Sequence, residues 1–220
     1  HRIPVPAFAV FPINRKIRRP SRLNLPLIVK SVSEDASLGI AQASVVDSDE
    51  KLNERVTFIH ERIGTHAIAE QYIDGRELYV GVMGNDRLHV LPTWELDFGK
   101  MAQGANRIAT LRVKHNIDYQ EERGIAIGPA KGLSPELQAS ITRMVKRICR
   151  ALQIDGYARI DFRLSADGVP YFLEANPNPE ISREEEFAAS AKHDKIDYPE
   201  LLERLLQLGI GRARALEWAN

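Results

Sequence analysis

Cysteine is almost absent from this 220-residue chain: Cys149 stands alone, so no disulfide can form within the chain. No uninterrupted apolar run approaches the roughly 20 residues that a membrane-spanning helix needs. Charge of one sign is not in excess either, because thirty basic residues balance thirty acidic ones. These absences exclude a disulfide framework, and we expect a cytoplasmic protein that acts on neither a membrane nor nucleic acid.

The start of the chain has little regular pattern. It begins with His1 rather than Met, and we interpret the sequence as a piece of a longer protein. A basic cluster follows that lacks interleaved aromatic side chains, so we interpret it as a linker rather than a nucleic-acid site. It consists of Arg15, Lys16, Arg18, Arg19 and Arg22. With 44% hydrophobic residues, the chain can bury a substantial core, as one domain or as two small lobes.

Two strand-forming runs near the C-terminus carry the strongest signal. Residues 157–164 and 169–176 flank Asp167-Gly168, a dipeptide that suits a two-residue type I′ turn. In that register Asp161 lies directly across from Glu174, and Arg159 across from Asn176. The opposite face then carries apolar side chains and belongs to the core; these are Ile160, Phe162, Leu164, Tyr171, Leu173 and Ala175.

Opposed carboxylates on neighbouring strands, with Cβ atoms roughly 5 Å apart, repel each other unless a cation lies between them. Asp161, Glu174 and the amide oxygen of Asn176 form an all-oxygen ligand set that suits Mg²⁺ and does not indicate zinc. The alternative is an exposed sheet face on which each carboxylate pairs with an arginine, such as Arg159 or Arg163. The hairpin alone does not decide between the two.

The remaining pattern predicts an α+β fold. We expect strands over 25–31, 40–46, 67–73, 77–83 and 88–93, with Asp74-Gly75 as the turn of a hairpin. Asp47 followed by Glu50 is a capping-box signature, and it predicts a helix whose apolar stripe is Leu52, Val56 and Ile59.

The second half alternates a loop-rich section with helices. Residues 94–132 are rich in turn residues, with one expected strand over 107–113. Ser134 as N-cap and Pro135 at the first position begin a helix in which Cys149 is expected to be a buried, inert thiol. Its expected buried stripe is Leu137, Ile141, Met144, Ile148 and Leu152. Helices are also expected over 186–192 and from Asp197, the last one burying Leu201, Leu202, Leu205 and Leu206.

Four stretches, in this order, resemble the ATP-grasp superfamily and, within it, the D-alanine-D-alanine ligase-like enzymes. They read LPLIVKSVSEDASLGI, AIAEQYIDGRELYV, IATLRVKH, and GYARIDF with YFLEANPNPE. The resemblance implies the ATP-grasp fold, in which two α+β lobes with mainly antiparallel sheets grip ATP between them. We expect a linker at 1–24, a small lobe at 25–92, a large lobe with the metal site at 93–212, and a tail at 213–220.

The resemblance also implies a nucleotide site. Lys30 would place a point charge against the phosphates, while Ser37 and Gly39 would offer a hydroxyl and close backbone approach to them. Glu77 would accept a hydrogen bond from the ribose. The segment that reads the adenine edge would comprise Glu70, Gln71, Tyr72 and Ile73. Taken alone, these are also features of a surface lysine, an ordinary turn and an amphipathic hairpin.

The implied reaction is ligation of a small-molecule carboxylate and an amine. ATP phosphorylates the carboxylate, the amine attacks the acyl phosphate, and the products are an amide, ADP and phosphate. Lys114 would reach the transferred phosphate, assisted by Arg107 or Arg112, and Arg159 would stabilise the acyl phosphate and the tetrahedral adduct. Asp161, Glu174 and Asn176 match the magnesium ligands of the family, with Glu174 bridging two ions and Mn²⁺ as an alternative metal.

The sequence departs from the family at two points. Glu180 stands where the family carries a glycine, and Ser182 and three glutamates follow at the expected substrate end. The Glu180 amide could still donate to an oxyanion, but its carboxylate argues against D-alanine as acceptor and would attract a cationic amine. The N-terminal substrate-binding domain of the family is absent from this sequence. The alternative function is therefore a Mg-ATP-binding module that is incomplete without that domain or a partner. A third interpretation is a plain α+β structural domain. The sequence also leaves a homodimer open.

Overall fold

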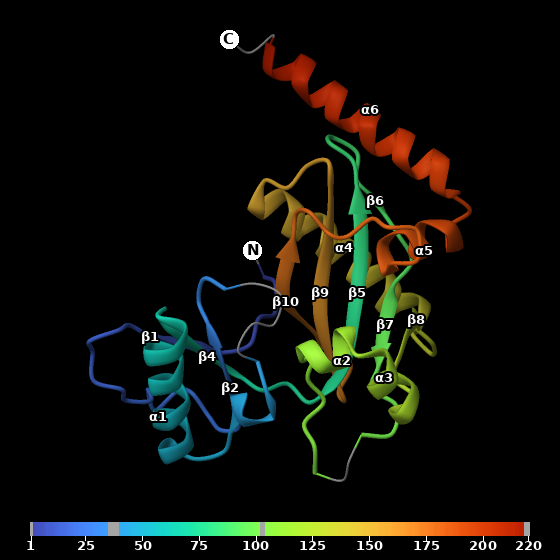
Figure 1. The fold of residues 1–220 in the computed structure, drawn as a ribbon. Helices are drawn as coiled ribbons and strands as arrows, with labels where there is room; N and C mark the ends of the chain where they lie inside the picture. The colour runs from blue at the N-terminus through green and yellow to red at the C-terminus, as the bar shows by residue number, and fades with distance from the viewer. Residues whose placement is uncertain (1, 35–39, 102–103, 218–220) are drawn as a thin grey trace. The chain divides into compact units, whose positions relative to one another are not determined.

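The computed structural model describes residues 2–34, 40–101 and 104–217 (Figure 1). The chain divides into two compact units, each with its own sheet. Unit 1 comprises residues 1–5, 75–97 and 127–220, and unit 2 comprises residues 6–74 and 98–126. No helix among the described residues is long and apolar enough to cross a bilayer.

Unit 2 is built on a four-stranded antiparallel sheet. The strands are β1 (Phe8–Phe11), β2 (Leu27–Ser31), β3 (Val45–Val46) and β4 (Ala67–Gln71), in the order β1-β4-β2-β3. Helix α1 (Asp49–Phe58), continued by the π-helical turn η2 (Ile59–Ile63), packs on the sheet. Leu52, Val56 and Ile59 are fully buried there, which confirms the predicted apolar stripe.

Two local predictions for unit 2 are wrong. The N-cap of α1 is Ser48, whose side chain accepts from the Lys51 amide, while Asp47 forms an ion pair with Lys51 outside the helix. The strand expected over 40–46 is reduced to β3, because the 3₁₀ turn η1 (Gln42–Ser44) precedes it.

The strand expected over 107–113 is also wrong: residues 107–110 have no regular secondary structure, and α2 (Leu111–His115) begins within this stretch and is followed by α3 (Ile117–Arg123). Thr110 and Asn116 are their N-caps and accept from the amides of Val113 and Tyr119. Such side-chain to backbone bonds favour helix starts over strand pairing, even where Ile and Val raise the strand propensity.

The sheet of unit 1 has the strand order β10-β9-β5-β7-β8, with β6 also paired to β5. Its strands are β5 (Gly75–Met83), β6 (His89–Val90), β7 (Trp94–Asp97), β8 (Ala126–Pro129), β9 (Tyr157–Ser165) and β10 (Pro170–Asn176). Strand β5, expected in the small lobe and in a hairpin with 67–73, pairs along its whole length with β9 instead. The hairpin across Asp74-Gly75 is therefore wrong; the predicted lobe boundaries stay a prediction.

Helices cover both faces of this sheet. Helix α4 (Pro135–Leu152) begins at the predicted N-cap Ser134 and packs on the face of β5 that carries Leu78, Val80 and Val82. Helices α5 (Glu186–His193) and α6 (Tyr198–Glu217) pack with Met83 at the end of β5, through Phe187 and Leu201 among others. Cys149 is 1% exposed on α4, and burial raises the pKa of its thiol to about 11, which confirms an inert cysteine.

Three leucines expected in the core are exposed. Leu152 ends α4 and is 52% exposed, and Leu202 and Leu206 of α6 are 39% and 62% exposed. The remaining stripe residues of both helices are buried or half-buried. The periodic pattern thus predicted the helices correctly but overestimated the width of their buried faces.

The β9–β10 hairpin holds the predicted carboxylates in register by an unexpected route. The Gly168 amide donates to the Ser165 carbonyl, and the Ser165 amide donates to that of Val169, so the loop has three residues and the predicted two-residue turn is wrong. A longer loop shifts the pairing by one position, and Phe172 lies across from Phe162. A bulge between Phe172 and Glu174 then restores the predicted register further along.

The shifted register also changes which side chains face the core. Phe172 packs edge-on against Phe162, with ring centroids 6.4 Å apart, and belongs to the core. Tyr171 lies across from Arg163, on the other face. Tyr171 and Leu173, both expected in the core, are half-buried and lie outside the core clusters of the described residues.

Candidate functional site

The site face of the hairpin carries the four predicted residues in the predicted pairs. Asp161 lies across from Glu174, and Arg159 lies across from Asn176. All four belong to unit 1. The Asp161 side chain is 5% exposed and that of Arg159 13%, so the β9 side of this face is buried, whereas Glu174 on β10 is exposed.

Arg159 is held from three sides. Its Nε and Nη2 donate to the two carboxylate oxygens of Asp161, at 2.8 and 2.9 Å, and its Nη1 donates to Glu186 at the start of α5. The guanidinium also lies 4.8 Å from the ring centroid of Tyr79. Since a guanidinium has five N–H donors, two remain to bind an anion.

Sequence reasoning missed Glu186 as a member of this cluster. In the sequence Glu186 is the last of three consecutive glutamates, and its partner Arg159 is 27 residues away in the chain. A carboxylate in the first turn of a helix is favoured by the helix dipole, which is the signal that could have drawn attention to it.

Burial dominates the electrostatics of Asp161. It raises the pKa of this carboxyl to about 7, against the opposing effect of the Arg159 guanidinium, and the nearby carboxylates of Glu174 and Glu77 raise it further. Negative charge therefore accumulates at this point of the sheet. Arg159 compensates it only in part.

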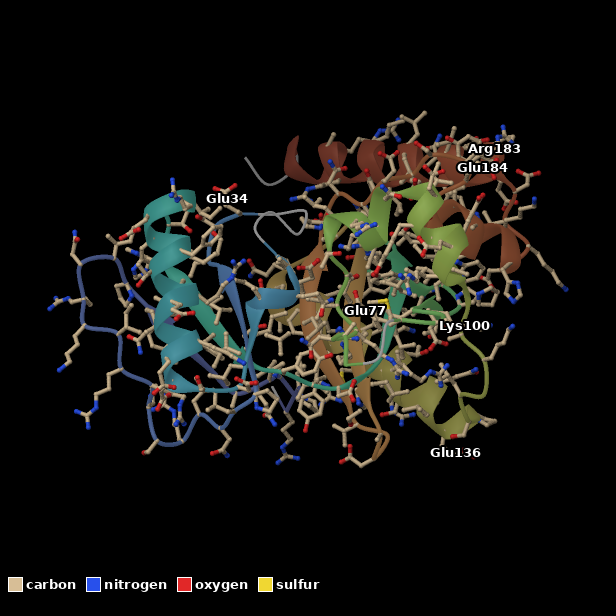
Figure 2. All side chains as sticks on the ribbon, turned by 60° about the horizontal axis from the view of Figure 1, so that its bottom comes forward. Glu34, Glu77, Lys100, Glu136, Arg183 and Glu184 are labelled. Carbon is tan, nitrogen blue, oxygen red and sulfur yellow. The ribbon has the colours of Figure 1, made fainter. Side chains whose placement is uncertain are left out.

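Glu77 forms a second buried ion pair on the same sheet. Its carboxylate accepts from Arg163 at 2.9 Å and from the Tyr79 hydroxyl at 2.8 Å. Arg163 also donates to the Gly75 carbonyl. Figure 2 labels both Glu77, which is buried, and Glu184, which is exposed. Both carboxylate oxygens of the predicted ribose acceptor thus already have donors.

The donor set of the predicted metal site fits a hard divalent cation. Asp161 and Glu174 are opposed, and the second lone pair of each Asp161 oxygen remains after its bond to Arg159. Glu174 is exposed and its carboxylate has no hydrogen bond or ion pair within the described ranges, while Asn176 Oδ1 accepts only from the Asn178 amide there. The alternative of one arginine per carboxylate therefore holds for Asp161 alone. A group of three His, Cys, Asp or Glu side chains fit to hold a metal does not occur among the described residues.

The predicted nucleotide residues of unit 2 lie on and next to its sheet. Lys30 on β2 forms an ion pair with Glu70 on β4 at 2.5 Å. The Tyr72 amide donates to the Pro26 carbonyl, its hydroxyl accepts from the Arg107 amide at 3.1 Å, and Ile73 is 9% exposed. Gln71 is exposed at the end of β4. Ser37 and Gly39 lie outside the described residues.

Lys114 is half-buried on α2, also in unit 2. Its carbonyl accepts from the Gln120 side chain at 3.0 Å, which ties α2 to α3. The neighbouring Arg112 lies over the ring of Tyr119, 4.1 Å from its centroid. A short helix therefore carries this lysine, which follows directly after the strand expected over 107–113.

At the predicted substrate end, Glu180 and Ser182 contact each other. The Ser182 amide donates to Glu180 Oε1 at 3.0 Å, and its hydroxyl donates to the same oxygen. These bonds lower the pKa of Glu180, so it is a carboxylate at neutral pH. Both residues are exposed.

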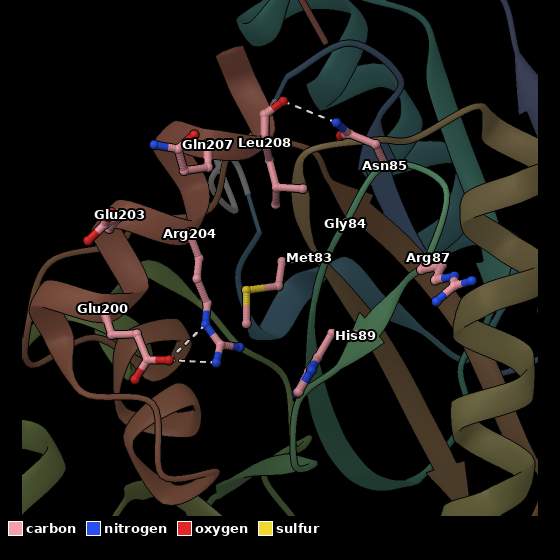
Figure 3. Close-up of a pocket in the computed structure, with 10 residues that line it drawn as sticks. All are labelled: Met83, Gly84, Asn85, Arg87, His89, Glu200, Glu203, Arg204, Gln207 and Leu208. Carbon is pink, nitrogen blue, oxygen red and sulfur yellow. Dashed lines mark hydrogen bonds and ion pairs between the residues drawn. The ribbon is translucent and has the colours of Figure 1, made fainter. Parts of the chain in front are cut away.

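A pocket of about 520 Å³ lies elsewhere in unit 1, between the β5–β6 turn and α6 (Figure 3). Arg204 pairs there with Glu200, and His89 pairs with Asp194. None of the predicted site residues lines it. This pocket is therefore distinct from the hairpin site.

The two sheets, the antiparallel β9–β10 hairpin and the buried Arg159–Asp161 pair define the class: an α+β protein of the ATP-grasp fold. The D-alanine–D-alanine ligase of Bacillus anthracis, solved in complex with ATP, aligns at a TM-score of 0.75 and 21% identity over 98% of this chain and 63% of its own. A family model described as D-ala D-ala ligase C-terminus matches residues 2–207. The chain belongs to this family, as the sequence motifs predicted.

Curated relatives of known sequence support the same family membership. The D-alanine–D-alanine ligase of Bordetella petrii is 33% identical over 204 residues, which cover 91% of this chain and 58% of the relative. That of Desulfotalea psychrophila is 30% identical over 192 residues, covering 87% and 56%. The chain thus spans somewhat more than half the length of these relatives.

Proposed function

We propose that the chain is the ATP-grasp core of an ATP-dependent carboxylate–amine ligase that forms an amide through an acyl phosphate, with release of ADP and phosphate. The observation that carries the proposal is the site face of β9 and β10, where Arg159, Asp161, Glu174 and Asn176 lie in facing pairs. Family membership supports it. Positioning and electrostatics supply the catalysis, and no side-chain nucleophile is required.

Arg159 is the catalytic residue of unit 1 in this proposal. Asp161, Glu186 and the Tyr79 ring fix its guanidinium, so its two remaining N–H donors keep one direction and stabilise charge on the acyl phosphate and the tetrahedral adduct. Asp161, Glu174 and Asn176 would hold Mg²⁺, two ions with Glu174 shared between them, or Mn²⁺ in its place. Bound metal supplies neutralisation of phosphate charge.

The nucleotide residues keep the roles that the resemblance implies. Lys30 and Lys114 bind phosphate oxygens, Ser37 and Gly39 cradle them, and Glu77 accepts from the ribose once its bonds to Arg163 and Tyr79 rearrange. The adenine edge meets the backbone of Glu70, Gln71, Tyr72 and Ile73. Glu70 also holds Lys30 by its ion pair, which fixes the ammonium group for the phosphates.

The amine substrate is cationic in this proposal. Glu180 is ionised at neutral pH and exposed beside Ser182, so this end of the site offers negative charge to an incoming ammonium group. A free amino-acid carboxylate would be repelled there. Small-molecule carboxylate and amine are thus the partners of the site.

The test is ligand-linked stability. Millimolar Mg-ATP should raise the melting temperature by several degrees, because about 100-fold excess over the Kd adds roughly 2.7 kcal/mol. Asp161→Asn with Glu174→Gln should abolish the rise, whereas Asp86→Asn with Glu54→Gln, a charge-matched pair of exposed acids, should keep it. An unchanged melting curve of the parent protein would count against any ATP site.

A Mg-ATP-binding module without ligase activity is the second candidate, and the exposed Glu180, which stands at the predicted substrate end where the family carries a glycine, favours it. Phosphate release against a panel of amino acids and amines separates the two. The module predicts a thermal shift with no phosphate release from this chain. Absence of release from a longer protein that includes the upstream region would overturn the ligase.

A further inference from the structure

The pocket between the β5–β6 turn and α6 lies within unit 1 and takes no part in the proposed ligase site (Figure 3). Its volume of about 520 Å³ falls in the range of small-molecule sites, roughly 300–1,000 Å³. Asn85 joins its two walls, because its side-chain amide donates to the Leu208 carbonyl on α6 at 3.0 Å and its Oδ1 accepts from the Gly156 amide at 3.1 Å. The walls are therefore held in place before a ligand binds, which lowers the entropic cost of binding.

The inner wall of this pocket is apolar. Met83, at the end of β5, is 3% exposed, and Leu208 on α6 packs against the same hydrophobic cluster. Figure 3 shows the Leu208 side chain directed towards Met83. The flexible thioether of methionine adapts its shape to the group it meets and makes favourable contacts with aromatic rings. This wall thus suits a large apolar group of a ligand.

An ion pair on α6 forms a polar side of the same pocket. Arg204 donates through Nε and Nη2 to one oxygen of Glu200, Oε1, at 3.0 and 2.6 Å. Within the described ranges, Arg204 Nη1 and Glu200 Oε2 have no hydrogen bond or ion pair. A guanidinium binds a carboxylate through paired N–H donors, and a carboxylate oxygen accepts from an ammonium group. One α-amino acid can satisfy both groups at once, because a single carbon joins its carboxylate and its ammonium.

The charges around the pocket favour a ligand without net charge. Two arginines and two glutamates line it, and their formal charges cancel; these are Arg87, Arg204, Glu200 and Glu203. A net anion or a net cation would leave one sign of this lining without a partner. A zwitterion complements both signs.

We propose that this pocket binds a free α-amino acid with a large apolar side chain. The carboxylate of the amino acid lies against Arg204, its ammonium against Glu200, and its side chain against Met83 and Leu208. The inference is independent of the proposed ligase function, since none of the predicted site residues lines the pocket.

Isothermal titration calorimetry of the whole chain with phenylalanine and three matched analogues tests the ligand class. Phenylalanine should bind with a saturable heat. Phenethylamine lacks the carboxylate, 3-phenylpropionate lacks the ammonium, and alanine lacks the apolar body, so each should bind at least about tenfold more weakly. Absence of a saturable heat with phenylalanine up to about 10 mM would overturn the proposal. So would an affinity for alanine, or for either singly charged analogue, that equals or exceeds the affinity for phenylalanine.

Substitutions on α6 test the location. Arg204→Gln and Glu200→Gln should each weaken phenylalanine binding at least about tenfold, because each removes the partner of one charged group of the ligand. The Arg204 and Glu200 side chains are 44% and 46% exposed, so neither variant should lose its fold, and circular dichroism checks this. Glu122→Gln, at an exposed position on α3 of unit 2, is the control and should bind like the parent. Phenylalanine binding that is unchanged in both α6 variants would place the ligand elsewhere and overturn the proposal.

Discussion

Asp161 is a buried carboxylate whose charge is only partly compensated, and it is also a predicted metal ligand. Its carboxylate is almost fully buried beside two other carboxylates, and Arg159 balances only part of this charge. Burial of an incompletely compensated charge costs stability, and such costs concentrate at functional sites. A divalent cation or an arginine in a fixed position beside Asp161 compensates the buried charge and reduces this cost. The Asp161 carboxylate therefore favours binding of a cation at this site.

The conflict predicts a pH effect on stability. The pKa of Asp161 is raised from 3.8 to about 7 in the folded protein, so between these values the folded state binds more protons than the unfolded state. Stability from this group is therefore present below pH 4 and is lost as pH rises towards 7, by at most about 1.4 kcal/mol per pH unit. Asp161→Asn removes the titration. Urea unfolding at pH 5 to 8 should show the variant gaining stability relative to the parent as pH rises.

Other carboxyl groups change the absolute curves, so the difference between parent and variant is the quantity to measure. Glu184→Gln, at an exposed position, should follow the parent in parallel. If the curves of Asp161→Asn and the parent also run parallel between pH 5 and 8, Asp161 is fully ionised throughout, and Arg159 outweighs burial.

At the scale of elements, the β9–β10 hairpin shows what the sequence can and cannot predict. Alternation and the Asp-Gly signal predicted the facing pairs Asp161–Glu174 and Arg159–Asn176, and these pairs are correct because the bulge cancels the register shift of the longer loop. They could not distinguish a two-residue from a three-residue loop, because both use glycine at positive φ, and the compensating bulge has no sequence signal of its own. The contact between Glu186 and Arg159 could not be predicted for a related reason, because it depends on how α5 packs on the sheet.

The prediction of a strand around residue 110, where the structure has a helix, was wrong for a different reason. Ile108, Leu111 and Val113 favour a strand, yet the caps at Thr110 and Asn116 favour helices, and the caps win. The expected β4–β5 hairpin failed because an Asp-Gly turn signal does not reveal that the two strands join different sheets. Local sequence signals thus predicted where strands occur better than they predicted which strands pair with each other.

Gly75 marks the point where β5 enters the sheet beside β9. A Cβ there would lie 2.1 Å from the Leu164 carbonyl oxygen, a backbone atom that cannot rotate away. Gly75→Ala should therefore lower the free energy of unfolding by about 1–3 kcal/mol or more, since the paired strands must separate locally. Chemical denaturation measures this. Gly128→Ala, where a Cβ would meet nothing within 4 Å, is the control and should be neutral or slightly stabilising; equal effects of the two would contradict the steric account.

The whole molecule contains separate hydrophobic cores. The cluster around Leu27, Val29 and Leu52 lies entirely in unit 2, and the cluster around Ile141, Ile148 and Phe162 lies entirely in unit 1. Each sheet therefore depends on the helices of its own unit for burial. Local stability can then differ between the units, because cooperative opening follows contiguous packing.

This separation predicts independent loss of protection in the two units. Leu52→Ala removes a fully buried side chain from α1 and should destabilise unit 2 by about 2–5 kcal/mol. Hydrogen exchange of the β2 and β4 amides should accelerate more than that of the β5 and β9 amides. Ile141→Ala, equally buried on α4, should reverse the pattern. Equal acceleration in both sheets from either variant would mean that the two cores unfold as one cooperative unit despite sharing no residue.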